Sequence, residues 1–321
     1  MPKNKLIAEL CQNHNGSISL LKEMVVAAKE SGIKYLKIQD IKSQELTHRK
    51  KFDRGLIRKK KTIIIKRPYK QELARLKTLD LQSNFTNIFI EECIKAKVQP
   101  IVTPFTYSSI DRIRDKNFKF IKIASYDCSA LPFVIEASNL GSKLIVSTGA
   151  TRLNEINKTV LFLKKKKKLE ALLHCVSIYP TPLEKCNINK IKLLKKLFSK
   201  IKIGWSDHSK FEDCGHAPAL ASILVGGSYI ERHFTIQNKS KTKDGPVSIN
   251  PTEASELTKI INKDKKYIKN YLDENYKNWE KCLGSGSSKL THQELLNRDY
   301  YKGRFASIVS NKYNFNWHHK K

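Results

Sequence analysis

The chain has 321 residues, of which 40% are hydrophobic, and this is enough to bury a large core in one or two domains. No run approaches the roughly 20 apolar residues of a membrane span, and the N-terminal sequence MPKNKLIAEL lacks the apolar segment of a signal peptide, so we expect a cytoplasmic protein. A net charge of +31 is compatible with a nucleic-acid partner or with an electrostatic field that attracts anionic ligands. The lysines are spread along the whole chain, however, and this favours the simpler interpretation that they lie in solvated loops and at helix ends.

Short apolar, β-branched runs recur along the chain, and an amphipathic segment of helical period follows most of them. Strands are predicted at residues 6–10, 35–39, 98–103, 120–124, 144–147, 171–175, 201–205 and 229–234. Helices are predicted at residues 19–31, 87–97, 108–116, 132–140, 153–164, 189–198, 214–225 and 252–271. Eight such βα units favour an α/β fold of the (β/α)8 class, a TIM barrel, over an open doubly wound sheet.

Two segments depart from the repeat. Residues 40–83 are too long for an ordinary βα loop, and the run TIIIKRPYK within them suggests a small hairpin or another excursion at the mouth of the barrel. After about Tyr271 the chain becomes polar and passes through a Gly-Ser-Gly-Ser-Ser run at 284–288. We therefore expect a catalytic barrel at residues 1–275, followed at 276–321 by a linker and an extended C-terminal arm without a separate folded domain.

Polar residues follow the predicted strands, at the end of the barrel where active sites of this fold lie. Those collected in chain order include Glu9, His14, Lys37, Gln39, Thr103, Lys122, Ser125, Asp127, Ser147, His174, Tyr179, Ser206, His208, Glu231 and His233. We expect these side chains to converge on one pocket.

Two lysines, Lys37 and Lys122, lie inside otherwise apolar strands, where an unpaired ammonium is costly and an anionic ligand offsets the cost. The hydroxyls of Thr103, Ser125, Ser147 and Ser206 complete a set suited to a small anion that carries phosphate. An internal salt bridge, for example between Lys37 and Glu9, is the alternative for each lysine taken alone.

Histidines end two adjacent predicted strands. His208 and His233 are placed to bind one divalent ion, with Glu9 or water completing its shell, although a single histidine at a strand end is usually a structural residue. His14 fits a turn as well as a substrate contact, and His174 is better interpreted as a buried core histidine. The other histidines, at 48, 216, 292, 318 and 319, are expected at the surface.

The seven cysteines contain no CxxC pair, which fits neither a zinc ribbon nor a disulfide framework, so most are expected to be reduced core residues.

The longer motifs resemble those of the N-acetylneuraminate (sialic acid) synthase family, whose members also make other nonulosonic acids. In chain order they are IAELCQNHNG, YLKIQ, VTPF, IKIAS, IVSTGA, LLHCVSIYPTP, IGWSDHS, IERHFT and GRFAS. The SIYPTP, SDHS and ERHFT segments are highly specific, whereas IVSTGA alone is weak.

The resemblance implies roles for individual residues. It implies that His208 and His233 bind a metal, Mn2+ or Mg2+, and that phosphoenolpyruvate is held by Lys37, Thr103, Lys122, Ser125, Ser147 and Ser206. It implies sugar-side positions at Asp127, Tyr179 and Phe305. With Glu9 as the group that orients water or moves a proton, the candidate catalytic residues are Glu9, Lys37, Lys122 and Asp127.

The departures from the family concern the sugar side. Members usually carry Gly-Pro-Asp-His after the last strand, whereas this chain reads DGPVS from Asp244, which makes Asp244 a candidate substitute for the missing aspartate. Asp127 replaces a glutamate, and Ser177 stands where asparagine is common. Typical members continue into an antifreeze-like domain that supplies an arginine to the partner subunit's sugar, whereas this sequence ends at Lys321. We expect an altered sugar pocket.

The resulting prediction is an enzyme that condenses phosphoenolpyruvate with an N-acetylated amino sugar such as N-acetylmannosamine, giving a nonulosonic acid and phosphate. Its predicted partners are these two substrates, with no nucleic acid or membrane, and the sequence leaves a homodimer open. One alternative is another phosphoenolpyruvate-dependent synthase that makes a keto-deoxy sugar acid. The other is an inactive barrel that binds a sugar or RNA.

Overall fold

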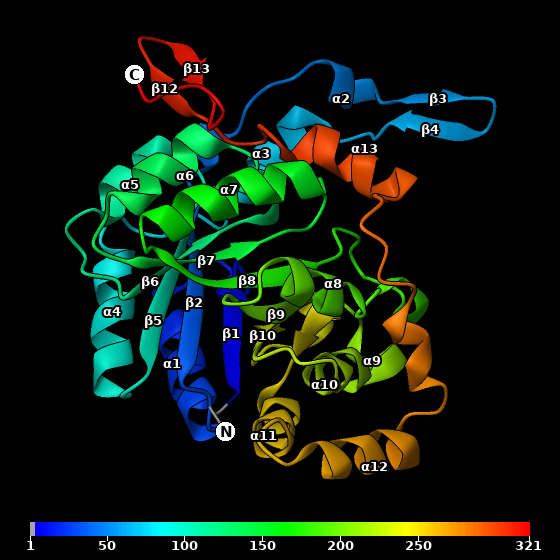
Figure 1. Cartoon of the computed structure of the whole chain (residues 1–321). Helices are drawn as coiled ribbons and strands as arrows, with labels where there is room; N and C mark the ends of the chain where they lie inside the picture. The colour runs from blue at the N-terminus through cyan, green and yellow to red at the C-terminus, as the bar shows by residue number, and fades with distance from the viewer. Residues whose placement is uncertain (1–3) are drawn as a thin grey trace.

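The structure is a computed structural model that describes residues 4–321, and its centre is a closed parallel β-barrel (Figure 1). The strands pair in the order β1-β2-β5-β6-β7-β8-β9-β10, and β1 pairs with β10 to close the ring. Their bounds are β1 Lys5–Cys11, β2 Tyr35–Asp40, β5 Gln99–Pro104, β6 Phe120–Ile123, β7 Lys143–Ser147, β8 Leu169–Cys175, β9 Lys202–Asp207 and β10 Tyr229–Phe234. All eight predicted strands and the predicted TIM barrel are confirmed.

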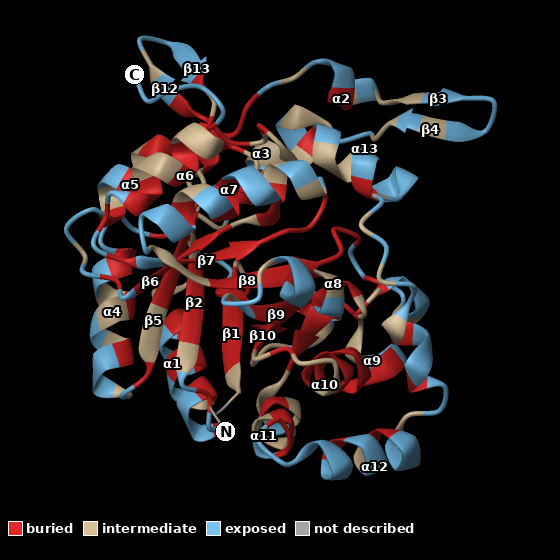
Figure 2. Cartoon of the chain, viewed as in Figure 1, coloured by how far each residue is buried: buried red, intermediate tan, exposed pale blue. Residues whose placement is uncertain are grey.

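The two faces of each barrel strand pack against different layers, because successive side chains of a strand point to opposite sides. Alternate residues fill the lower interior, where they form one apolar cluster of Ile7, Ile101, Phe120, Ile145, Ala171, Leu173 and Tyr229. The residues between them face outward and join the larger core beneath the helices. In Figure 2 the strands are accordingly buried along most of their length.

Helices follow the strands and cover the barrel, as Figure 1 shows. They are α1 Ile18–Glu30, α4 Phe85–Lys95, α5 Tyr107–Ile113, α6 Leu131–Ser138, α7 Leu153–Lys165, α8 Lys190–Leu197, α9 Phe211–Cys214, α10 Ala217–Leu224, α11 Pro251–Ile260 and α12 Lys265–Asn275. In α1, Ser17 caps the first turn by accepting a hydrogen bond from the Leu20 amide at 3.1 Å. Among the described residues, no helix is long and apolar enough to cross a membrane.

Two predicted helices are each broken in the structure. The predicted helix 252–271 is split into α11 and α12. The side chain of Asp264 caps the start of α12 by accepting a hydrogen bond from the Tyr267 amide at 2.8 Å. The predicted helix 214–225 is divided between α9 and α10, because Gly215 adopts a φ of 54° that ends the first turn. The apolar period continues across both breaks, so periodicity alone does not reveal them.

The predicted excursion at 40–83 contains the expected hairpin, which projects from the barrel in Figure 1. Its elements are α2 Lys51–Arg54, β3 Leu56–Arg58, β4 Lys61–Ile64 and α3 Tyr69–Lys77. The antiparallel pair β3–β4 turns at Lys59 and Lys60, which both have positive φ and are exposed. The lysine run 59–61 therefore lies in solvent, as its sequence pattern indicates.

The C-terminal arm is more ordered than the extended segment that the sequence suggested. It contains α13 His292–Tyr301 and a hairpin of β12 Ser307–Val309 with β13 Lys312–Asn314. Thr291 and Glu294 form a capping box that begins α13, a T-x-x-E signal that the sequence carries. The arm packs on the excursion, where the Thr47 amide donates to the Arg304 carbonyl at 2.9 Å. Both segments therefore cover the same end of the barrel (Figure 1).

Candidate active site

A cavity of about 290 Å³ lies at the carboxyl ends of the barrel strands. It brings together all the predicted site residues except Asp127 and Phe305. Those that line it are Glu9, Lys37, Thr103, Lys122, Ser125, Ser147, Tyr179, Ser206, His208, His233 and Asp244. Of the fifteen strand-end polar residues named in the sequence analysis, twelve line this cavity, and His14, Asp127 and His174 do not.

The alternation of each strand aims these side chains into the barrel. Glu9 lies two residues after the inward-facing Ile7, and Lys122 lies two residues after the inward-facing Phe120. The same step places Glu231 two residues after Tyr229, on the cavity wall. The interior is thus apolar at the bottom and charged at the top.

The two buried lysines each pair with a carboxylate. Lys37 donates to Glu9 Oε2 and, at 3.1 Å, to Thr103 Oγ1. Lys122 donates to Glu231 Oε1 at 3.2 Å. The internal salt bridge considered as the alternative for Lys37 is therefore present. Glu231, which the sequence analysis collected without a role, is the matching partner of Lys122.

Burial and charge together shift the titration of this cluster. Burial lowers the pKa of Lys37 to about 7, with the Glu231 carboxylate opposing this shift. Burial by itself raises the pKa of Glu231, but the ammonium groups of Lys122 and Lys37 outweigh it and lower that pKa to about 2. Since two ammonium groups face two carboxylates, the cluster has little net charge, and a bound dication would make it attractive to an anion.

The hydroxyl side of the cavity has free hydrogen-bonding capacity. Ser147 Oγ is buried and has no partner among the described residues. Ser125 Oγ accepts from the Gly149 amide at 3.2 Å. A Cβ on Gly149 would lie 2.9 Å from Ser125 Oγ and 2.4 Å from Ser177 Oγ, so only glycine fits at this position. These groups are suited to hold the oxygens of a small anion.

The two histidines predicted to bind a metal have different neighbours. The rings of His208 and His233 lie 5.4 Å apart between centroids. His208 Nδ1 lies 3.6 Å from Cys175 Sγ, and its ring packs 4.1 Å from that of Tyr179. His233 Nδ1, in contrast, is buried and has no partner among the described residues. An orphaned imidazole nitrogen in a polar cavity fits a metal ligand.

A different group offers a metal three converging ligand atoms. One donor atom from each of Cys11, His233 and Asp244 lies within 4.8 Å of the other two. The sequence analysis treated Cys11 as a core residue and Asp244 as a sugar contact. The sequence carries only a weak hint of this arrangement, a cysteine two residues after the first strand-end glutamate.

Asp127 does not line this cavity. It belongs to the short turn Ser125–Asp127, and it accepts a hydrogen bond at 2.8 Å from Asn316 of the C-terminal arm. Asn316 also donates to the Phe105 carbonyl at 2.9 Å. The Asp127 carboxylate is therefore bound by the C-terminal arm.

Phe305 is also placed differently from the implied sugar-side position. It is buried with Leu46 and Leu76 in a small apolar cluster between the arm and the excursion. Its ring meets that of Phe105 edge to face at 5.7 Å. Burial of the aromatic ring against these neighbours is favourable and keeps Phe305 off the cavity wall.

Asp127→Asn is expected to stabilise the protein in a pH-dependent way. Burial raises the pKa of Asp127 to about 7, with the Asn316 hydrogen bond opposing the shift. Because this folded-state pKa exceeds the unfolded value of about 4, stability is lost as pH rises from about 4 to 7. Thermal unfolding of both proteins should show the variant more stable at pH 8 and equal at pH 4. An equal difference at both pH values would contradict this.

The remaining histidines mostly follow the sequence analysis. His174 is buried, and its Nε2 lies 3.0 Å from the Cys186 carbonyl, which confirms a core histidine. His14 Nδ1 accepts from the Gly16 amide at 3.1 Å, which fits the turn-stabilising alternative. His216 was wrongly expected at the surface, because it is fully buried and packs against Phe211. All seven cysteines are free and buried, as predicted.

The outer part of the cavity is basic. Arg67, Arg75, Lys243 and Arg304 all line it. Glu72 accepts hydrogen bonds from Arg75, at 2.9 Å, and from Arg304, and lies 3.6 Å from Lys243 Nζ. These residues come from the excursion, the loop after β10 and the arm, so no single motif in the sequence marked them as a group.

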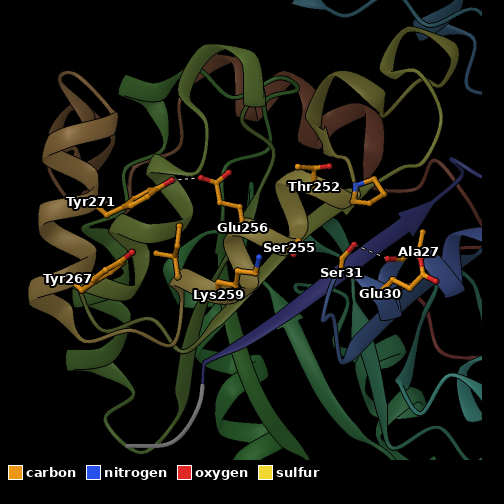
Figure 3. Close-up of a pocket in the computed structure, with 11 residues that line it drawn as sticks. Ala27, Glu30, Ser31, Thr252, Ser255, Glu256, Lys259, Tyr267 and Tyr271 are labelled. Carbon is orange, nitrogen blue, oxygen red and sulfur yellow. Dashed lines mark hydrogen bonds between the residues drawn. The ribbon is translucent and has the colours of Figure 1, made fainter.

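A larger cavity, of about 650 Å³, lies outside the barrel between α1, α11 and α12 (Figure 3). Its lining includes Glu30, Ser255, Lys259 and Tyr267, and Tyr271 donates a hydrogen bond to Glu256 across it. None of the strand-end residues line this cavity. The chemistry is therefore concentrated in the smaller cavity.

Comparison with known proteins identifies the family. Residues 24–272 match the NeuB family. The N,N'-diacetyllegionaminic acid synthase of Campylobacter jejuni is 29% identical over 97% of this chain and 86% of that protein. The N-acetylneuraminate-9-phosphate synthase of Drosophila melanogaster is 30% identical over 80% of this chain and 66% of that protein.

Among solved structures, the sialic acid synthetase of Leptospira borgpetersenii in complex with citrate superposes with a TM-score of 0.70. It is 25% identical and covers 93% of this chain and 91% of that chain. The sequence match and the shared barrel agree along most of the chain, so this protein belongs to the NeuB family of sialic acid synthase-like enzymes.

Proposed function

We propose that this chain condenses phosphoenolpyruvate with an N-acetylated amino-sugar aldehyde, such as N-acetylmannosamine, to give a nonulosonic acid and phosphate. The observation that carries the proposal is the single cavity that joins buried lysines, hydroxyls and two histidines in a NeuB family barrel. The names of the related synthases support a product of this type.

The proposed phosphoenolpyruvate site consists of Lys37, Lys122 and the hydroxyls of Thr103, Ser125, Ser147 and Ser206, all of which line the cavity. The lysines attract the carboxylate and phosphate, and hydroxyls such as the unpartnered Ser147 donate hydrogen bonds to them. Because strand backbones hold these groups, little reorganisation is needed when the anion binds.

A divalent ion, Mn2+ or Mg2+, completes the proposed site. His208 and His233 are the ligands that the family resemblance implies, and the orphaned His233 Nδ1 fits such a role. When bound, the ion supplies positive charge that polarises the sugar aldehyde.

The proposed reaction forms one carbon–carbon bond. The methylene carbon of phosphoenolpyruvate attacks the aldehyde carbon, and the aldehyde oxygen takes up a proton. Water then adds to the cationic carbon that bore the phosphate, and the C–O bond to phosphate breaks. Glu9 lies beside Lys37 at the end of β1 and is the proposed group that accepts the proton of this water.

The test is an assay of the full chain with phosphoenolpyruvate, Mn2+ and a panel of N-acetylated and di-N-acetylated hexosamines. Phosphate release should require both the sugar and the metal, and mass spectrometry should show the sugar extended by three carbons. With 18O in the bridging position of phosphoenolpyruvate, the label should leave in phosphate. Sugar-independent release of phosphate, or label kept in the sugar acid, would contradict the proposal.

The basic outer cavity favours a second candidate, an amino sugar that carries a phosphate at the end remote from its aldehyde. Four cations line this region, and Glu72 and Asp244 are the carboxylates beside them. Arg304 Nε is buried without a partner among the described residues, so the region retains capacity for an anion. A product phosphorylated at carbon 9, as in the name of the Drosophila relative, requires an acceptor phosphorylated at carbon 6.

We expect the phosphorylated acceptor to have the higher kcat/KM and unphosphorylated N-acetylmannosamine to have a high Michaelis constant. Arg67→Gln should lower kcat/KM for the phosphorylated acceptor about fivefold, which is the scale of roughly 1 kcal/mol for an exposed charge contact. It should leave the unphosphorylated acceptor unchanged. Lys61→Gln removes the same charge on β4, away from the cavity lining, and serves as the control. Equal losses for both acceptors would reject the phosphate contact.

A further inference from the structure

We propose that Tyr301 of the C-terminal arm, held by Tyr126, contacts the N-acyl group of the amino sugar and determines which acyl groups the enzyme accepts. The inference rests on the proposed function and deepens it, since it assigns one side of the cavity to one part of the acceptor. Its evidence is a group of apolar and aromatic side chains that line the cavity, which we call the apolar wall: Ile41, Phe105, Tyr126 and Tyr301.

The contacts of α13 turn Tyr301 towards the cavity. Tyr301 is the last residue of this helix, and Asn297 and Arg298 lie one turn before it, on the same face. Asn297 donates to the Ser177 carbonyl at 2.7 Å, and Arg298 donates to the Ala150 carbonyl at 2.6 Å. Both carbonyls belong to loops that follow barrel strands, so this face of α13 covers the mouth of the barrel, where Tyr301 lines the cavity.

Tyr126 fixes the orientation of the Tyr301 ring. The two rings stack with their centroids 4.9 Å apart and an angle of 14° between their planes. Tyr300 also meets the Tyr301 ring edge to face at 5.0 Å. Two aromatic contacts restrict the ring, so this part of the wall has a defined shape. Tyr126 directly follows Ser125, and the wall therefore begins beside the proposed phosphoenolpyruvate site.

Ile41 and Phe105 form the other part of the wall. Both pack against the apolar cluster that contains Phe305. The Arg304 guanidinium lies 4.7 Å from the Phe305 ring centroid and 5.5 Å from that of Tyr301. These contacts join the two parts of the wall through the arm. Phe305 supports the wall without lining the cavity.

The two proposed substrates have few groups that suit an apolar wall. Phosphoenolpyruvate is a small anion, and its proposed contacts are lysines and hydroxyls in the inner part of the cavity. The sugar carries hydroxyls along its carbon chain, and a terminal phosphate suits the basic outer residues. The methyl group of the N-acyl substituent is the apolar group that remains, and its burial against aromatic rings is favourable. The acyl group therefore belongs against the apolar wall.

A wall of restrained rings also limits the size of the acyl group. Closely packed side chains do not move aside for extra methylenes without cost, and an apolar pocket discriminates by about 10–200-fold for one methylene. The wild-type enzyme should therefore prefer an N-acetyl to an N-butanoyl acceptor by about tenfold or more in kcat/KM.

The experiment measures kcat/KM of the full chain for mannosamines that carry an N-acetyl, N-propanoyl or N-butanoyl group, each with and without a 6-phosphate. Tyr301→Ala should lower the value for the N-acetyl acceptor but not for the N-butanoyl acceptor, so that the preference falls about tenfold. Tyr301→Phe keeps the ring and should keep the preference. The change should be the same with and without the phosphate, because the wall and the basic residues contact different parts of the acceptor.

Tyr313→Ala is the matched control. Tyr313 lies on the same arm, is 38% exposed and does not line the cavity, so its removal should leave the preference at the wild-type value. Tyr301→Leu keeps a smaller apolar side chain and should give an intermediate preference. This variant replaces Tyr301→Ala if the alanine variant fails to fold, as judged by circular dichroism.

Calorimetric titration of the same sugars in the presence of Mn2+ separates acyl recognition from catalysis. An equal loss for all acyl groups in Tyr301→Ala would overturn the inference, because the tyrosine would then only hold the arm in place. Sugars that bind with an acyl preference but are not condensed would reject only the proposed function. Condensation without an acyl preference would reject only the inference, and a wild type that neither binds nor condenses any of these sugars would reject both.

Discussion

His233→Ala is expected to abolish measurable turnover while leaving the fold intact. The imidazole Nδ1 has no protein partner among the described residues, so its removal leaves no buried hydrogen-bond partner unpaired. The lost electrostatic stabilisation should lower kcat by about 10²–10³ or more, the range observed when one preorganised polar contact is removed. Steady-state rates of phosphate release, with circular dichroism to check the fold, provide the measurement.

His208→Ala is the companion variant and should also lose turnover, because its ring faces the same cavity. His48→Ala is the control, since His48 is exposed on the excursion and pairs with Asp53. Full activity in either cavity variant, or in enzyme treated with a chelator, would refute a metal site built on these residues.

Lys122→Met is expected to raise the Michaelis constant for phosphoenolpyruvate more than tenfold. Loss of a buried charged contact costs about 2–5 kcal/mol, which corresponds to roughly thirtyfold or more in affinity. The sugar requirement should change little, because Lys122 lies in the inner charged cluster of the cavity and not in its basic outer part. Initial rates measured with each substrate varied in turn test this difference.

The salt bridge with Glu231 complicates this variant and suggests its control. Lys122→Met leaves the buried Glu231 carboxylate with only Lys37 and Ser206 nearby, so the variant should also be less stable. The double variant Lys122→Met/Glu231→Gln removes both charges and should recover thermal stability without recovering phosphoenolpyruvate affinity. If the double variant regains wild-type affinity, Lys122 serves only to neutralise Glu231.

The sequence alone was sufficient to predict the barrel and the strand residues that line the inner part of its cavity. Each apolar run followed by a helical period is a local signal, and eight of them in succession leave few folds to consider. The inward direction of Lys37, Lys122 and Ser206 also follows from local geometry, since a strand alternates its side chains whatever surrounds it. Glu231, two residues before His233, was collected from the sequence by the same alternation, but without its role as the partner of Lys122.

Only the tertiary structure decided which of these groups meet. Cys11 and Asp244 are 233 residues apart, and Asp127 and Asn316 are 189 apart, so the path of loops and of the C-terminal arm determines both contacts. The same holds for the pairing of Lys122 with Glu231 across the barrel and for the basic residues gathered at its mouth. Local periodicity specifies how each element forms and which way its residues point. The balance of charge in a buried cavity depends instead on distances between elements, which no local pattern encodes.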